Sequence, residues 1–283
     1  MNTRYHFNVP RIQAAVRYVL MSIAALLTLA PLWILIVNSF KPQVRIIDNP
    51  VAPPPSFDFQ YLSNALGQLE FFKSIGFTLF ITVFAVFLIV LLSSMAAWIM
   101  VRSKLKIAGV LFMAFVAAML IPFQAIMYPL IQLFDALGLK NLGGLILMYG
   151  GFGLSMSMFL YHGFVKSVPL EVEEAAFIDG AHIVQMFFFI VMPLLKSITV
   201  TVIIINAMWI WNDYLLPFFV IGNSENKTLV LSLYFAQILA GQYGNPWQLI
   251  FPAVLLTITP IVVVFLFLQR FIVKGISAGA VKG

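Results

Sequence analysis

The sequence predicts an all-α membrane protein, and three observations support that fold class. Of the 283 residues, 62% are hydrophobic and only 9% are charged, whereas a soluble domain has about 25% charged residues. The mean hydropathy of +1.03 exceeds what the core of a soluble domain of this size could bury. The third observation is a series of mainly apolar stretches, each long enough to cross a bilayer as a helix. Backbone groups in lipid must form their hydrogen bonds within their own segment, so these stretches are predicted to be helices.

Six such stretches, almost free of Asp, Glu, Lys and Arg, predict six transmembrane helices within a single domain that spans residues 18–270. The predicted spans cover residues 18–40, 75–101, 107–133, 145–165, 197–220 and 249–269. The first span is too long for the apolar core of a secretory signal, so it is predicted to be an uncleaved anchor. Residues 1–17 form a short N-terminal segment and residues 271–283 form a C-terminal tail.

The distribution of basic residues predicts the orientation of the chain. If the N-terminus is cytoplasmic, eleven of the 16 Lys and Arg residues fall on the cytoplasmic side of the six spans. Cytoplasmic loops are enriched in Lys and Arg, so both termini and the tail 271–283 are predicted to be cytoplasmic. The net charge of +6 is therefore a signal of topology. Nucleic acid is not an expected partner, because no dense basic patch exists.

Two outer connections are predicted to carry short helices. The connection from Lys41 to Ser74 contains five prolines, four of them within residues 50–55, where they favour an extended path. An interfacial helix is expected over 56–72. The stretch Thr228–Leu239 is apolar but too short to cross a bilayer, so it is predicted to be an interfacial or re-entrant helix. An exposed turn at 241–246, rich in Gly and ending in Pro, is expected to follow it.

Several chemistries are excluded by composition and motif. The chain has no Cys, so it cannot form a disulfide, a thiolate metal site or a Cys nucleophile. Its three His residues are isolated and lack the spacing of metal ligands, and no catalytic residue, metal or cofactor is predicted. The phosphate-binding pattern G-x-x-x-x-G-K-[ST] is absent, so the chain is not expected to be an enzyme that hydrolyses ATP.

The cytoplasmic connection 166–193 differs from the other connections because it is long, acidic and helix-forming. Pro169 suits the first turn of a helix, and Asp179-Gly180 offers a stop, since Gly readily adopts a left-handed conformation. A second helix is expected from Ala181 to Pro193. Composition alone leaves two interpretations open: a solvated hairpin, or a segment that contacts another protein.

The order of residues in this connection carries a specific motif. Glu174-Ala175-Ala176 is followed after three residues by Gly180, and after nine more by Ile190-Val-Met-Pro193. This pattern resembles the EAA motif of permease subunits from binding-protein-dependent ATP-binding cassette (ABC) importers, and the only departure is Met192 in place of Leu. Further segments across nearly the whole chain are similar to the carbohydrate branch of these permeases. These are Trp211-Asn212-Asp213 with Pro217, Lys227-Thr-Leu, Gln269-Arg-Phe271 and the tail from Gly275.

The resemblance implies a type I ABC importer permease fold, similar to the smaller, six-span permease of maltose-type systems. It implies a permease subunit in a bacterial or archaeal cytoplasmic membrane that imports a sugar, oligosaccharide or polyol. Its implied partners are a second permease subunit, two ATPase subunits and an extracytoplasmic solute-binding protein, besides membrane lipid. The residues implied to contact the ATPase are Glu174, Ala175, Ala176, Asp179 and Gly180.

Polar residues within predicted spans are candidates for a substrate pathway, because polar groups in lipid usually face a bundle interior or an aqueous path. Gln124 and Tyr128 lie four residues apart, on one face of the third span. The second group lies toward the outer half of the fifth span and comprises Asn206, Trp209, Asn212 and Asp213. Aromatic rings beside amides or carboxylates suit sugars. Interfacial anchoring and hydrogen bonds between helices are the alternatives.

The outer connection that follows Thr228–Leu239 holds four candidates for contact with the solute-binding protein. They are Gln242, Tyr243, Asn245 and Trp247. The resemblance suggests this role, because the corresponding connection of maltose-type systems reaches toward the solute-binding protein. Anchoring at the membrane surface is the alternative, given the interfacial preference of Trp and Tyr.

Three other functions are alternatives to a carbohydrate importer. An ion-coupled secondary transporter would need ionisable residues near the bilayer midplane, but only Asp213 interrupts a span, close to its end. A membrane-embedded enzyme would need paired acids, a His cluster or a Ser–His arrangement at one depth. An ABC permease for a non-carbohydrate solute stays open, and the sequence does not identify the solute.

Overall fold

The computed structural model describes residues 11–241 and 244–280, with side chains described for 13–239, 241 and 244–267. The regular elements among these residues are helices, which confirms the predicted all-α fold class. The chain divides into two compact units. The first comprises Met1–Gln68 and Leu239–Leu256, and the second comprises Leu69–Ile238 and Thr257–Gly283.

The first unit contains one long apolar helix and two short ones. They are α1 (Arg11–Asn38), α2 (Gln43–Asp48) and α3 (Gln60–Gln68). The unit also includes the start of α14 (Trp247–Ala280). Helix α3 overlaps the interfacial helix expected over 56–72, whereas α2 was not foreseen from the sequence.

The loop that follows α1 is held against the end of that helix by side-chain hydrogen bonds. Trp33 Nε1 donates to the carbonyl of Val51 (2.9 Å) and Asn38 Nδ2 donates to the carbonyl of Pro50 (2.8 Å). Lys41 is buried, 2% exposed, and its ammonium donates to Asn38 Oδ1 (3.0 Å) and to the carbonyl of Asn49 (3.1 Å). Burial lowers the pKa of Lys41, because removal from water disfavours the charged form.

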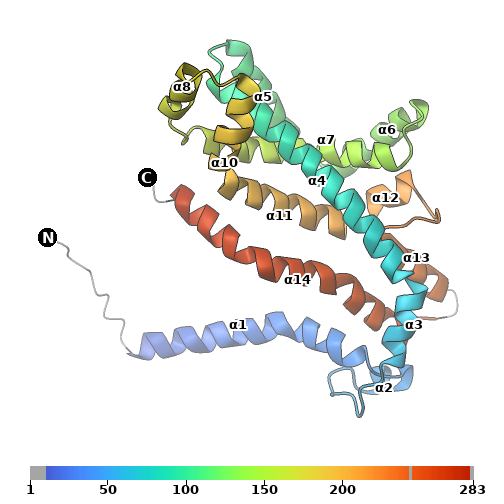
Figure 1. The fold of residues 1–283 in the computed structure, drawn as a ribbon. Helices are drawn as coiled ribbons and strands as arrows, with labels where there is room; N and C mark the ends of the chain where they lie inside the picture. The colour runs from blue at the N-terminus through green and yellow to red at the C-terminus, as the bar shows by residue number, and fades with distance from the viewer. Residues whose placement is uncertain (1–10, 242–243, 281–283) are drawn as a thin grey trace. The chain divides into compact units, whose positions relative to one another are not determined.

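The second unit is built around α4 (Phe71–Arg102) and α7 (Leu142–Val165), which make extensive contact with each other and with α11 (Lys196–Asn212). Figure 1 shows α4, α7 and α11 running alongside one another. The remaining helices are α5 (Lys106–Ala118), α6 (Phe123–Ala136), α8 (Leu170–Ile178), α9 (Ile183–Gln185), the π-helical turn η1 (Met186–Val191), α10 (Met192–Leu194), α12 (Leu215–Val220) and α13 (Leu229–Gly241).

Small residues allow α4 and α7 to approach closely. A Cβ atom at Gly150 would lie 2.7 Å from Leu88 Cδ2, and one at Gly153 would meet the side chain of Ile89 and, at 2.7 Å, Asn206 Oδ1. In lipid the helices gain no hydrophobic free energy by associating, so close van der Waals packing between small residues becomes a main source of stability. The two glycines therefore set the separation of α4 from α7.

The predicted span 107–133 is not one helix. It is divided into α5 and α6, which meet at an angle of 105° across residues 119–122. Pro122 explains the break, because it has no N–H to donate and because it disfavours the helical conformation at the preceding residue. The sequence predicted a single span over these residues.

The predicted span 197–220 is also divided. Helix α11 ends at Asn212, Asp213 adopts an extended conformation, and α12 begins at Leu215. Asp213 Oδ1 accepts a hydrogen bond from the Leu215 backbone N–H (2.9 Å), so the carboxylate satisfies an N–H group that has no partner within α12. Before α11, the chain bends by 80° at Leu195.

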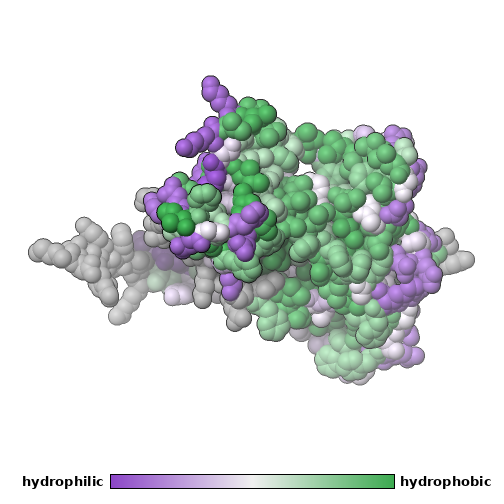
Figure 2. Space-filling view, turned by 45° about the horizontal axis from the view of Figure 1, so that its top comes forward, coloured by the Kyte–Doolittle hydropathy of each residue, from purple (hydrophilic) through white to green (hydrophobic). Residues whose placement is uncertain are grey.

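Four helices of the described chain are long and apolar enough to cross a membrane, and there are up to six spans if each bent pair is counted as one. Much of the described surface visible in Figure 2 is hydrophobic, and α1 and α4 expose many large apolar side chains. Helix α13 has 13 residues, too few to cross a bilayer. The last helix, α14, continues to Ala280, eleven residues beyond the end of the predicted sixth span.

Substitution of Gly153 by Val is expected to destabilise the protein by about 1–3 kcal/mol, because the added side chain would force α4 and α7 apart. Gly163 lies on the same helix, and a Cβ there would have nothing within 4 Å, so Gly163→Val serves as the control. Thermal unfolding of both variants in detergent checks this prediction. Equal unfolding temperatures for the two variants would contradict it.

Candidate functional site

The connection 166–193 contains a short helix that begins and ends at well-defined residues. Pro169 precedes the first residue of α8 as its N-cap, one position earlier than the sequence suggested. The helix ends in a turn in which Gly180 has φ +83°. The Gly180 and Ala181 N–H groups donate to the carbonyls of Phe177 (3.1 Å) and Ala176 (3.0 Å). This closure satisfies carbonyls at the end of the helix and requires the left-handed conformation that Gly adopts without strain.

The five residues of the predicted ATPase contact do not share one environment. Glu174, Ala175, Asp179 and Gly180 are exposed, so they form an accessible surface around the end of α8. Ala176 is buried and packs into the hydrophobic core of its unit. Helical geometry explains the difference, because adjacent residues point in directions about 100° apart.

Glu173 forms an anchor that was missed from the sequence. The residue is buried, 5% exposed, and its carboxylate accepts hydrogen bonds from two residues of α4. Trp98 Nε1 donates to Oε2 (2.9 Å), and Arg102 donates to Oε1 through Nε (3.0 Å) and Nη2 (2.7 Å). Arg102 Nη2 also donates to the carbonyl of Val168 (2.9 Å), just before α8. Charge-assisted hydrogen bonds from a guanidinium fix both the distance and the orientation of the carboxylate that accepts them. They therefore hold α8 at a defined position relative to the end of α4.

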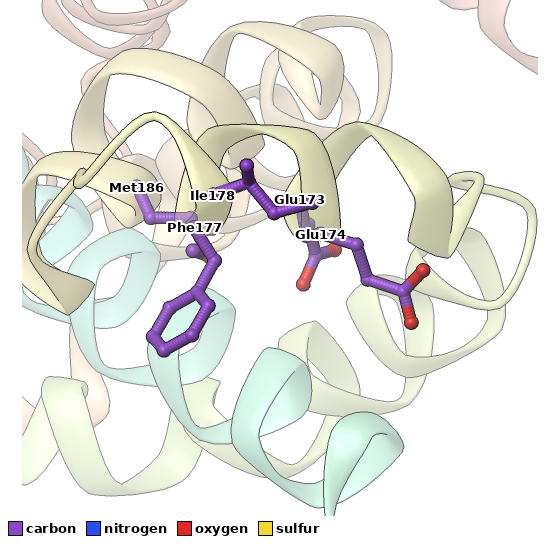
Figure 3. Close-up of a pocket in the computed structure, with 5 residues that line it drawn as sticks. All are labelled: Glu173, Glu174, Phe177, Ile178 and Met186. Carbon is purple, nitrogen blue, oxygen red and sulfur yellow. The ribbon is translucent and has the colours of Figure 1, made fainter.

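A hollow of about 430 Å³ lies beside α8, lined by Glu173, Glu174, Phe177, Ile178 and Met186. Figure 3 shows Glu173, Glu174 and Phe177 projecting toward the same side of α8. Phe177 is 74% exposed and Ile178 is 82% exposed. Two large apolar side chains at the tip of a helix, next to carboxylates, form a surface suited to a protein partner.

The second arm of the connection packs against the same end of α4. It begins with a capping box in which the His182 N–H donates to Gln185 Oε1 (3.0 Å) and the Val184 N–H donates to His182 Nδ1 (3.4 Å). Phe187 of η1 is 1% exposed and lies against Trp98, with ring centroids 5.5 Å apart. Trp98 therefore contacts both arms, through its N–H and through its ring.

A second site lies at the break between α5 and α6. A pocket of about 400 Å³ is lined by residues from both helices, by Phe152 and Ser155 of α7 and by Trp209 of α11. The ring of Phe123 lies 4.7 Å from that of Phe152 and 6.2 Å from that of Trp209. The broken helix thus creates an aromatic pocket that contains one of the predicted pathway residues, Trp209.

Asp213 is linked to this pocket through Tyr149, a residue that the sequence did not single out. The Tyr149 hydroxyl donates to Asp213 Oδ2 (2.9 Å), and the Tyr149 ring lies 5.5 Å from that of Trp209. Asn206 is buried, and its Nδ2 donates to Ser157 Oγ of α7 (2.9 Å). Asn212 is exposed and donates to the carbonyl of Met208 (2.7 Å).

The other predicted pathway residues, Gln124 and Tyr128, are both exposed on α6. They lie four residues apart and so share a face of that helix. Neither lines the aromatic pocket. The structure therefore brings Trp209 and Asp213 together through Tyr149, and places Gln124 and Tyr128 apart from that cluster.

The predicted contact with the solute-binding protein is described only in part. Gln242 and Tyr243 lie outside the described residues, whereas Asn245 and Trp247 are exposed. Gln43 of α2 holds this connection: its N–H donates to Gln248 Oε1 (3.0 Å), and its Nε2 donates to the carbonyl of Asn245 (2.7 Å). The Gln248 N–H returns a bond to Gln43 Oε1 (3.3 Å).

Comparison with known proteins defines the class. Residues 89–278 match the family model described as "Binding-protein-dependent transport system inner membrane component". The chain is 38% identical over 260 residues to a probable starch degradation products transport system permease protein, AmyC, from Thermoanaerobacterium thermosulfurigenes. That alignment covers 92% of this chain and 94% of the relative. The chain belongs to this family and is a multi-pass inner membrane component of a binding-protein-dependent transport system.

Another relative and a solved structure agree with this assignment. The melibiose/raffinose/stachyose import permease protein MelC of Bacillus subtilis is 33% identical over 269 residues, covering 93% of this chain and 95% of that protein. A crystal structure of a bacterial ABC transporter that imports the acidic polysaccharide alginate contains a chain with the same fold. The TM-score is 0.79 at 23% identity, and the match covers 95% of this chain and 99% of that chain.

The comparisons confirm the resemblance that the EAA motif indicated, and the permease fold with it. Membrane components of ABC importers function with a partner permease, ATPase subunits and a solute-binding protein. Members of this family are the membrane subunits of such transporters and are not themselves the catalytic ones.

Proposed function

We propose that this chain forms half of the translocation pathway for a sugar, oligosaccharide or polyol and couples transport to ATP hydrolysis by two partner ATPase subunits. The observation that carries the proposal is α8, an exposed helix outside the spans that is fixed to its unit by buried contacts. The names of the relatives, a starch-product permease and a melibiose/raffinose/stachyose permease, support a carbohydrate as solute.

The surface around the end of α8 is the proposed ATPase contact. Its exposed polar and small residues are Glu174, Ala175, Asp179 and Gly180. Phe177 and Ile178 add exposed apolar surface. Ala176 supports this surface from the core and need not touch the partner. Burial of two exposed apolar side chains contributes about 1.5–3 kcal/mol for each side chain fully removed from water.

The aromatic pocket at the break between α5 and α6 is the proposed part of the pathway that meets solute. Sugars present C–H faces that stack on aromatic rings, and hydroxyls that need hydrogen-bond partners. Trp209, Phe123 and Phe152 supply rings, and Ser155 supplies a hydroxyl. Asp213 is proposed to position Tyr149 beside this pocket through their hydrogen bond. Asn206 is proposed to hold α11 against α7 through its bond to Ser157. Gln124 and Tyr128, on α6, are proposed to line the path outside this pocket, and Asn212 to line it beside Asp213.

Reconstitution of the complete complex tests the proposed function. This chain, its partner permease, the ATPase subunits and the solute-binding protein are purified together and placed in proteoliposomes. We expect sugars or polyols to stimulate ATP hydrolysis and to be taken up only when ATP is present. Uptake driven by an ion gradient without ATP, or stimulation by amino acids or peptides alone, would contradict the proposal.

Substitution of Gly180 tests the coupling surface. Gly180→Pro is expected to abolish uptake while the protein still inserts, because Pro holds φ near −65° and cannot adopt the +83° of this turn. Gly180→Asn is the matched control, since Asn tolerates the left-handed conformation, and it should retain most of the uptake. The rates of ATP hydrolysis and uptake are measured for both variants, and normal uptake by Gly180→Pro would refute this role.

Substitution of Trp209 tests the aromatic pocket. Trp209→Ala is expected to lower the transport rate roughly 2- to 12-fold, because an aromatic stacking contact contributes about 0.5–1.5 kcal/mol. Trp209→Phe keeps a ring in the pocket and should lose less. Transport of radiolabelled sugar is compared at equal amounts of inserted protein. An unchanged rate for Trp209→Ala would exclude Trp209 from the pathway.

A cysteine at Asn245 tests both the orientation and the contact with the solute-binding protein. We propose that Gln242, Tyr243, Asn245 and Trp247 contact this partner on the outer side and that both termini are cytoplasmic. The chain has no Cys, so Asn245→Cys provides a unique thiol. It should react with a membrane-impermeant maleimide from outside and cross-link to the solute-binding protein when solute and a trapped ATP state are present. Labelling from the cytoplasmic side alone would reverse the topology.

A further inference from the structure

The buried carboxylate of Glu173 connects the exposed helix α8 to the longest helix of its unit. It accepts hydrogen bonds from Trp98 and Arg102, which lie one turn apart at the end of α4. The Arg102 side chain is only partly exposed, 21%, and the Glu173 side chain is 6% exposed. The pair is therefore shielded from the water that surrounds Glu174.

A buried ion pair of this kind contributes more to geometry than to stability. Desolvation of two charges offsets much of their attraction, whereas loss of one partner leaves a buried charge without compensation. Three hydrogen bonds to one carboxylate also fix its orientation, because the guanidinium is planar and bonds through two of its nitrogens. A flexible attachment of α8 would not require a buried ion pair with three hydrogen bonds.

The other end of α4 is bonded to a different part of the unit. Thr78 Oγ1 accepts a hydrogen bond from the Leu229 N–H (2.8 Å), at the start of α13. The hydroxyls of Ser74 and Ser232 lie 2.9 Å apart. Helix α4 has 32 residues, about 48 Å at 1.5 Å per residue. It therefore joins α8 at one end to α13 at the other.

We propose that Glu173 is the positioning residue that makes α8 and α4 move as one rigid body, so that displacement of α8 is transmitted along α4 to α13. This inference rests on the proposed function, in which an ATPase moves α8. Glu173 does not touch the ATPase or the solute. It acts through Trp98 and Arg102, and it determines how much of the movement of α8 reaches the transmembrane helices.

Charge removal within the reconstituted complex tests this inference. Glu173→Gln keeps the shape of the side chain but removes its charge, and we expect the solute transported per ATP hydrolysed to fall roughly 5- to 150-fold, the range of typical coupling free energies. Glu171→Gln makes the same charge change at an exposed position of the same helix and should leave the ratio unchanged. A normal ratio for Glu173→Gln would overturn the inference.

A second variant covers the case in which Glu173→Gln does not assemble. Trp98→Phe removes one donor to Glu173 but keeps an aromatic ring against Phe187, and it should lower the same ratio by a smaller factor in an assembled complex. An unchanged ratio for Trp98→Phe in that case would count against the inference.

Covalent linkage distinguishes a rigid body from a contact that opens during transport. The double variant Arg102→Cys with Glu173→Cys is expected to be uncoupled, and a short bifunctional thiol reagent that bridges the two cysteines should restore transport per ATP. If the bridged form were inactive while the unbridged form transported, the contact would have to open, and the inference would be wrong.

The wild-type complex distinguishes failure of the proposed function from failure of this inference. Failure of the wild type to show solute-stimulated hydrolysis would refute the proposed function, whereas a normal wild type beside an unaffected Glu173→Gln would refute only the inference.

Discussion

The constraint on which this structure depends is that lipid offers no hydrogen-bond partners to the backbone. Long helices meet it within themselves, as α4 and α7 do. Wherever the chain leaves a helix inside a predicted span, another group must replace the missing bonds. At Asp213 the carboxylate accepts the N–H of Leu215, and at Pro122 the missing N–H removes the need for a partner. The two breaks lie where the sequence supplies such a group.

The two breaks also provide the pocket and the polar groups of the second unit that could contact a solute. Straight apolar helices packed through glycines leave little room for a solute, whereas the 105° bend between α5 and α6 opens a pocket lined by aromatic rings. Asp213 holds the Tyr149 hydroxyl beside that pocket, so one carboxylate both caps α12 and orients a ring neighbour of Trp209. The proposed pathway and the interruptions of the spans therefore have the same origin.

Much of the fold followed from the sequence because membrane helices depend on local properties. The apolar stretches and the turn at Gly180 need only composition, spacing and backbone preference, and α13 was expected because its length excludes a span. The anchor at Glu173 could not be predicted in the same way, since Glu173 and Glu174 are adjacent acids in an acidic loop and their different burial depends on a partner 71 residues away. One signal was present: Glu173 shares a helical face with Ala176, and Arg102 ends a span. The division of 107–133 was missed because a proline inside an apolar stretch is compatible with a kink as well as with a break.

The arrangement of α8 separates two requirements that a coupling element must meet. A surface that binds a partner reversibly has to be exposed, and here it consists of small residues and two apolar side chains. A surface that transmits displacement has to be stiff, and a helix of nine residues gains little stiffness from its own hydrogen bonds. One short helix meets both requirements, because Glu173 and Ala176 are buried while Glu174, Ala175 and Phe177 are exposed. The stiffness comes from α4 through the buried carboxylate, and the specificity for a partner can vary on the exposed face without disturbing it.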